Sequence, residues 1–109
     1  MKRKILKEMH RNMIKNFLDT IILAKLRNSS PLSGYDIIEF IYKKFGILIS
    51  PGTIYAVLYS MERKGLIRGE LTQGKRTYVL TGQGTGAISV ILKSEEEIQV
   101  FMRTILNVR

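Results

Sequence analysis

The stretch from Ser50 to Gly65, SPGTIYAVLYSMERKG, constrains the fold of this chain more than any other segment. Ser50 is a typical N-cap and Pro51 suits the first helical position, while Gly65 suits a left-handed stop, so a helix is predicted over 50–64. At 100° per residue, one face of this helix is apolar. That face carries Ile54, Val57, Leu58 and Met61. The opposite face carries Gly52, Ala56, Tyr59 and Arg63, where a solvent face would carry more Lys and Glu.

Two further helices are predicted before this one. Apolar residues at three- and four-residue steps indicate a first helix from about Asn12 to Leu26. The NSSPLSG segment then predicts a turn, after which Ser33 and Asp36 resemble a capping box that starts a second helix. Gly46 is placed to end that helix, and ILIS at 47–50 suits a brief strand or an extended linker.

After Gly65 the hydrophobic period changes to that of strands. LIRGEL and RTYVLT are separated by TQGK, which predicts a β-hairpin over 67–80 with Gly74 in the turn. Lys75 and Arg76 then lie at or beside its tip. From Thr81, a suitable N-cap, helical spacing returns, although the glycines at 82, 84 and 86 predict a helix that is firm only from about Ala87.

This order of elements predicts a mainly α fold with a small antiparallel β-hairpin. Helix, helix, helix and hairpin is the order of a winged helix-turn-helix, in which the third helix enters the major groove and the hairpin lies along the backbone. We expect residues 1–84 to form a winged-helix DNA-binding domain that includes a basic N-terminal helix. Residues 85–109 are expected to add a C-terminal dimerisation helix, the whole chain forming a single compact unit.

The charge of the chain favours a polyanionic partner. Among 109 residues, 18 are Lys or Arg and 9 are Asp or Glu, which gives a net charge of +9 and a pI near 10.0. Double-stranded nucleic acid is the leading partner, although an anionic membrane surface or simple solubility is also consistent with this charge. The N-terminal residues do not read as a secretory signal and no apolar run could span a bilayer, so no membrane association and a cytoplasmic location are expected.

Catalytic and metal chemistry find little support. The chain has no cysteine, and His10 is its single histidine. The carboxylates show no paired or metal-binding spacing, and no Ser or Lys is set beside a histidine base. We therefore expect a protein that is not an enzyme and that needs no cofactor or metal.

Small residues on the outer face of the 50–64 helix would let its backbone approach the bases, and the free N–H groups at its start would bind a phosphate. The expected DNA-binding residues are Ser50, Pro51, Gly52, Thr53, Tyr55, Ala56, Tyr59, Arg63, Lys75 and Arg76.

Several of these residues have a second interpretation. The helix could be a core element with an uncharged outer face, and Lys75 and Arg76 could simply protect the edge of a hairpin from aggregation. Thr53 could complete the helix cap in place of binding a phosphate, and the Tyr55 ring could pack in place of donating from its hydroxyl. Tyr35 is expected to pack within the helix bundle.

Three segments together resemble the signatures of PadR-type winged-helix transcriptional regulators. They are SGYDIIEFI, SPGTIYAVLYSMERKGLI and RTYVLTGQG, and the resemblance extends over roughly Ile14 to Gly84. It implies a DNA-binding, repressor-like protein that works as a dimer. The sequence departs from the family pattern at Ala56 and in its many glycines over 82–86.

The last helix is the expected dimer contact. Ile91, Ile98 and Ile105 recur every seven residues, in a heptad-like seam that Ser94 interrupts. These residues could instead cover the core of their own chain, and we expect both contacts because the apolar stripe is wide. The expected interface residues are Ile91, Ile98, Phe101, Met102 and Ile105.

The basic N-terminus, which contains Lys2, Arg3, Lys4, Lys7 and Arg11, could be solvated, touch DNA or extend the first helix. Whether a small-molecule effector acts near the dimer interface is left open. The function expected from the sequence is that of a sequence-specific, dimeric DNA-binding regulator, most simply a repressor. A nonspecific architectural nucleic-acid binder and a protein-interaction winged helix are the alternatives.

Overall fold

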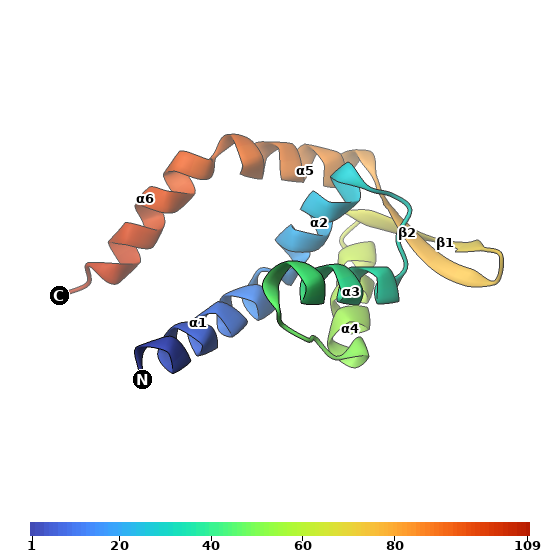
Figure 1. Cartoon of the computed structure of the whole chain (residues 1–109). Helices are drawn as coiled ribbons and strands as arrows, with labels where there is room; N and C mark the ends of the chain where they lie inside the picture. The colour runs from blue at the N-terminus through green and yellow to red at the C-terminus, as the bar shows by residue number, and fades with distance from the viewer.

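The computed structural model describes all 109 residues, arranged as six helices and one antiparallel hairpin (Figure 1). The predicted class, mainly helical with a small hairpin, is confirmed. The helices are α1 (Lys2–Asn16), α2 (Leu18–Asn28), α3 (Gly34–Phe45), α4 (Pro51–Arg63), α5 (Gly82–Lys93) and α6 (Glu95–Leu106), and the strands are β1 (Ile67–Thr72) and β2 (Lys75–Leu80).

Side-chain caps begin α3 and α5 at the predicted residues. The Ser33 hydroxyl accepts a hydrogen bond from the Asp36 N–H (3.1 Å), and the Asp36 carboxylate accepts one from the Ser33 N–H (2.9 Å). This is the predicted capping box. Gly46 ends α3 in the left-handed region with φ 70°, and the Thr81 hydroxyl accepts from the Gly84 N–H (3.1 Å) at the start of α5. These local signals alone fix the ends of both helices.

The two-stranded wing has a third, very short strand beside it. Leu32, in the connection between α2 and α3, exchanges backbone hydrogen bonds with Tyr78 of β2 at 3.2 and 2.8 Å. This bridge fastens β2 to the helical part of the molecule. The sequence predicts only a turn over residues 28–34, because a single bridging residue leaves no period-2 pattern to detect.

The first predicted helix is interrupted. Phe17 has φ −111° and ψ 21° and separates α1 from α2, although the Phe17 N–H still bonds to the Met13 carbonyl oxygen. The bend lets α2 turn its apolar side into the core while α1 leads away from it. Neither glycine nor proline lies at this point, so the sequence offers no helix-breaking signal.

The C-terminal segment is two helices in place of the single predicted one. The Oγ of Ser94 donates to the Val90 carbonyl oxygen (2.8 Å), a back-bond that bends helices, and α6 begins directly afterwards. In addition, α5 starts at Gly82, directly after the predicted cap at Thr81, so its first turns are helical despite the glycines at 82, 84 and 86. A Cβ on Gly84 would overlap the Leu66 carbonyl oxygen, so a glycine is required for α5 to pack this closely.

One hydrophobic core holds α2, α3, α4, the hairpin and α5 together, and we call this part of the chain, residues 18–93, the body. The linker between α3 and α4 contributes to it as well, through Ile47 and Ile49. The buried core residues are Leu18, Ile22, Leu23, Leu26, Ile37, Ile41, Ile47, Ile49, Ile54, Leu58, Met61, Ile67, Tyr78 and Ile88. The expected domain boundary after residue 84 therefore falls inside α5, which belongs to the body.

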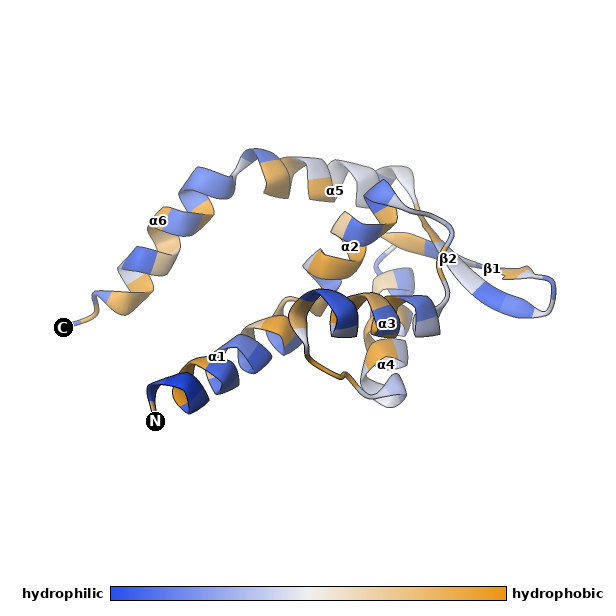
Figure 2. Ribbon diagram, in the orientation of Figure 1, coloured by the Kyte–Doolittle hydropathy of each residue, from blue (hydrophilic) through white to orange (hydrophobic).

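The remaining helices, α1 and α6, form two arms. Neither contains a buried residue, and both extend from the same side of the body, opposite the hairpin (Figure 1). The molecule is accordingly elongated, with extents of 52 × 30 × 21 Å. Figure 2 shows that hydrophobic and hydrophilic residues alternate along both arms. No helix in the structure has the length and hydrophobicity needed to cross a membrane.

Candidate nucleic-acid interface

The start of α4 is capped from within. The Ser50 Oγ accepts from the Thr53 N–H (3.3 Å) and lies 2.9 Å from the Thr53 Oγ1, while Pro51 has no N–H to satisfy. Thr53 thus completes the cap, which was one of its two predicted roles. The Gly52 N–H has no backbone or side-chain partner within the protein, and the space around Gly52 is open. This end of the helix is therefore available to an anion.

The two faces of α4 differ as the sequence predicts. Ile54, Leu58 and Met61 are buried in the core. The opposite face lies in solvent, and its Tyr59 side chain is 63% exposed with the Arg63 guanidinium 5.7 Å from its ring centroid. All ten expected DNA-binding residues are exposed. A helix with a buried apolar face and an open face of small, aromatic and cationic residues is suited to a groove.

Tyr55 lies on the flank of α4 that faces α3. A Cβ on Gly34 would lie 2.5 Å from the Tyr55 Cζ, so the ring occupies the space that this glycine leaves open. The pKa of the Tyr55 hydroxyl is raised, chiefly by burial. The packing role predicted for the ring is therefore present.

Tyr35 is more exposed than the sequence analysis expected. Its side chain is 63% exposed and its ring meets the Tyr55 ring edge-on at 6.3 Å, so the prediction that it packs within the helix bundle is wrong. Tyr35 lies 200° around α3 from the buried Ile37, and that angle could have revealed its outward position. The two rings extend the exposed aromatic surface from α4 to the start of α3.

The hairpin turns through Gln73 and Gly74, both with positive φ (53° and 75°), as the favoured two-residue turns require. Lys75 follows directly, paired with Thr72 in the register, and forms no salt bridge. The predicted turn is confirmed, and Lys75 is the free cation beside the tip.

Arg76 differs from Lys75. Its Nη2 donates to both carboxylate oxygens of Glu62, at 3.2 and 2.9 Å, and its guanidinium lies 5.7 Å from the Tyr78 ring centroid. The hydrogen bond to Glu62 is the main cause of a raised pKa of Arg76. Arg76 therefore points back toward α4 and not outward from the tip.

A shallow pocket of about 310 Å³ lies on the other flank of α4, against the junction of α1 and α2. Lys15 and Lys64 line it together with Ala56 and Ser60, so positive charge also borders this side of the exposed face. The outer face of α4 is thus flanked by cations on one side and by the hairpin on the other. No three His, Cys, Asp or Glu side chains gather in a way that could hold a metal ion.

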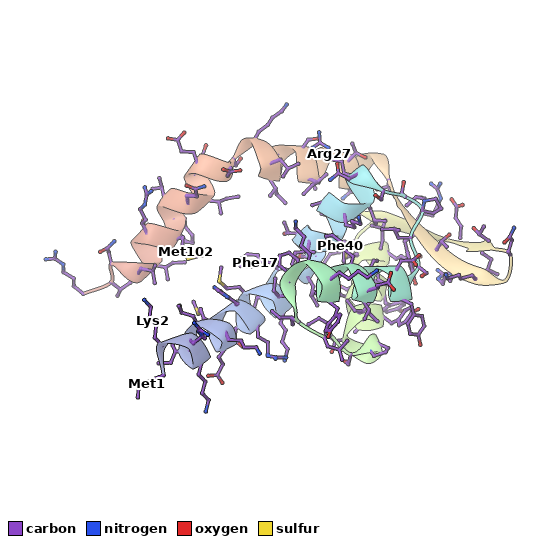
Figure 3. All side chains as sticks on the ribbon, in the orientation of Figure 1. Met1, Lys2, Phe17, Arg27, Phe40 and Met102 are labelled. Carbon is purple, nitrogen blue, oxygen red and sulfur yellow. The ribbon has the colours of Figure 1, made fainter.

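The expected dimer residues divide between body and arm. Ile91 of α5 is half-buried and packs against the core of its own chain. On α6, the side chains of Ile98, Phe101 and Ile105 are 47, 66 and 50% exposed, and Met102 projects from the side turned toward α1 (Figure 3). The uncovered part of the predicted seam is therefore on α6.

Comparisons with known proteins agree on one family. A family model described as the transcriptional regulator PadR-like family matches residues 22–89. Among solved structures, a PadR-like transcriptional regulator from Bacillus cereus has a TM-score of 0.73 at 23% identity, covering 90% of this chain and 99% of that one. A PadR family transcription regulator from Clostridium difficile has a TM-score of 0.68 at 25% identity, covering 84% and 99%.

A third structure is that of Bacillus subtilis PadR in complex with operator DNA. It has a TM-score of 0.62 at 32% identity, and the match covers 69% of this chain and 46% of that one. No curated protein matches the sequence significantly.

Proposed function

The chain belongs to the PadR-like family of transcriptional regulators, and from this premise we propose that it binds a specific double-stranded DNA sequence and represses transcription as a homodimer. In this proposal α4 enters the major groove and the hairpin lies on the backbone or in the minor groove. The N-terminal and C-terminal arms bring two copies together. The exposed face of α4 is the surface that reads the sequence.

The observation that carries this proposal is the character of that exposed face. Gly52 and Ala56 are small, so the helix backbone can approach DNA closely. The aromatic and cationic side chains of Tyr59 and Arg63 lie on the same face. Base edges are recognised by short-range hydrogen bonds and apolar contacts, which need such an approach.

Charge supplies the sequence-independent part of the affinity. The net charge of +9 attracts DNA over a distance, and Lys75 at the wing tip together with the Gly52 N–H can bind phosphates on either side of a groove. The remaining predicted contacts, Ser50, Pro51 and Thr53, shape the helix start that presents this N–H.

The proposal of a homodimer rests on the arms. An α6 with Ile98, Phe101 and Ile105 all about half exposed or more is costly to leave in water, and a second copy can cover it. A dimer also doubles the number of base pairs that are read, with half-sites about one helical turn apart. The 95–106 helix is thus proposed as the dimerisation element.

Selection of bound fragments from a random DNA pool, followed by footprinting on the enriched duplex, tests the proposed function. We expect enrichment of a motif with two related halves spaced by about one turn of DNA, and a protected region on both halves. Binding that discriminates little between the enriched and random duplexes at moderate salt would indicate the architectural alternative. No duplex binding at all would indicate a protein-interaction winged helix.

A further inference from the structure

One carboxylate joins the recognition helix to both strands of the wing. Glu62 lies in the last turn of α4, with its side chain 25% exposed. Its Oε2 accepts from the Gly69 N–H of β1 at 3.0 Å and from the Arg76 Nη2 of β2 at 2.9 Å. Glu62 therefore joins the end of α4 directly to both strands of the hairpin.

The path of Arg76 is built into the hairpin. In the register Arg76 is opposite Leu71, and its guanidinium runs back across Gly69 on the neighbouring strand. A Cβ on Gly69 would lie 2.5 Å from the Arg76 Nη2, so only glycine leaves this path open without moving the side chain. The guanidinium also lies over the Tyr78 ring, with 5.7 Å between the ring centroid and the Arg76 Cζ.

The cations of the wing are not equivalent. Arg68 is paired with Glu70 on its own strand at 2.9 Å, and Arg76 is paired with Glu62 on a different element at 2.9 Å. Lys75 forms no salt bridge, although its charge helps to lower the pKa of the Asp36 carboxyl. Only the Arg76 Nη2 bonds to Glu62, where it reaches both carboxylate oxygens, and this charge-assisted hydrogen bond holds the guanidinium toward α4 and away from the wing tip.

We propose that Glu62, Arg76 and the Gly69 N–H form a brace that fixes the wing against the recognition helix, so that Arg76 supports DNA binding by positioning the wing and not by contacting a phosphate. This rests on the proposed function, in which α4 and the wing bind one duplex together. A wing that is already held in the orientation that fits DNA loses no further conformational freedom on binding, because this entropy cost has been met on folding. Lys75 then supplies the phosphate contact.

The direction in which one substitution changes the DNA affinity distinguishes a brace from a direct phosphate contact. Glu62→Ala is expected to weaken binding to the selected duplex by about tenfold, because the wing is released. If Arg76 instead bound a phosphate, the same substitution would free it and remove a negative charge near DNA, so binding would tighten. Glu62→Gln removes the same charge but keeps an acceptor for Gly69 and Arg76, and it should retain most of the affinity. Unchanged or tighter binding by Glu62→Ala overturns the proposal.

Glu70→Ala is the matched control for loss of a wing carboxylate. Glu70 pairs only with Arg68 on the same strand and reaches no helix. We expect its loss to leave binding unchanged or slightly tighter, since one negative charge is removed and no two elements are uncoupled. A tenfold loss by Glu70→Ala would show that the loss of any ion pair in the wing weakens binding, and it would overturn the brace.

Salt dependence and additivity test Arg76 itself. Arg76→Ala should weaken binding by about tenfold with an unchanged slope of log affinity against log salt, whereas Lys75→Ala should reduce the slope by about 0.9. The double variant Glu62→Ala, Arg76→Ala should lose about tenfold and not the hundredfold expected of independent sites. A slope reduced by about 0.9 in Arg76→Ala, or additive losses, would contradict the proposal.

A readout without DNA separates failure of the brace from failure of the proposed function. The chain has no cysteine, so Gln73→Cys at the wing tip and Lys43→Cys on α3 can carry two spin labels in full-length protein diluted with unlabelled chain. We expect a narrow distance distribution that broadens in Glu62→Ala and Arg76→Ala but not in Glu70→Ala, with unchanged far-UV circular dichroism. Distributions that stay narrow in all variants overturn the brace even if the protein binds DNA.

Discussion

The body and the arms of this protein are both rich in apolar residues, yet only the body buries them within one chain. All 14 core residues lie between Leu18 and Ile88. Helix α6 has a run of apolar side chains of similar size, and Phe101 and Leu106 in it are 66 and 70% exposed. Helix α1 likewise has no buried residue, and only its half-buried Ile14 packs against the core. The same amphipathic pattern therefore has two different outcomes in one molecule.

This difference shows which conclusions an apolar stripe in the sequence supports. A stripe at helical spacing shows which residues gain from burial, but not whether the covering surface belongs to the same chain. In the body, short turns return each helix onto its neighbour. In the arms, the bends at Phe17 and Ser94 lead the helices away, and the stripe is left uncovered within the chain. Matched substitutions in the body and in the arms test whether the two parts differ in this way.

The largest expected effect is that of a core truncation in the body. Leu58 is fully buried, so Leu58→Ala should lower the free energy of unfolding by about 2–5 kcal/mol through lost burial and a residual cavity. The same chemical change on the arm, Leu106→Ala, should cost no more than about 0.5 kcal/mol at low protein concentration. Urea denaturation measures both values. Equal losses would show that α6 is covered within the monomer.

The next effect is on association. Phe101→Glu places a charge in the proposed seam of α6 and should raise the dimer dissociation constant by at least about 30-fold, equivalent to about 2 kcal/mol. Val100→Glu introduces the same charge 100° around α6 from Phe101, outside the proposed seam, and should change the dissociation constant little. Sedimentation equilibrium gives both constants. If both variants assemble like the unmodified protein, the partner surface lies elsewhere.

Loss of contacts on the exposed face of α4 should act on DNA binding and leave the fold intact. Tyr59→Ala or Arg63→Ala is expected to cost about 1–3 kcal/mol on the selected duplex, because both side chains lie where base edges would be. Lys75→Ala should lower affinity on selected and random duplexes alike and flatten the salt dependence. Fluorescence anisotropy titrations measure these effects. Equal losses on both duplexes for all three variants would contradict this division of roles.

The smallest expected effect concerns the capping box of α3. The hydrogen bond from the Ser33 N–H is the main cause that holds the pKa of Asp36 below its ordinary value of 3.8. A lowered pKa in the folded state stabilises the protein above pH 3.8, and this stability is lost as the pH falls through the folded pKa. Asp36→Asn should therefore cost about 0.3–1 kcal/mol at pH 7. Its difference from the unmodified protein should shrink below pH 3.8 in acid-unfolding titrations, and a difference independent of pH would exclude this origin.

Much of the body could be predicted from the sequence because its signals are local. The capping box at Ser33 and the left-handed glycines at 46 and 65 fix helix ends, and Gly74 fixes the hairpin turn, all within a few residues of chain. The exposed face of α4 follows from helical angle alone. The break at Ser94 could also have been found, since three glutamates follow it and favour a new helix N-terminus.

Other features could not be read from neighbouring residues. The bridge between Leu32 and Tyr78 joins positions far apart in the chain, and Arg76 meets Glu62 only because the hairpin folds back onto α4. Both depend on the placement of whole elements. The sequence predicts Arg76 at or beside the wing tip, but its pairing with Glu62 is visible only in the structure.

Most helix ends could be predicted from the sequence because they depend on local hydrogen bonding. The buried face of α4 follows from the 3.6-residue period, and the basic charge follows from composition. Only the tertiary structure decided that α5 belongs to the body and α6 does not, that Tyr35 is exposed beside Tyr55, and which wing cation is free. The physical reason is that burial and charge pairing depend on which elements pack together, and packing is a property of the whole fold.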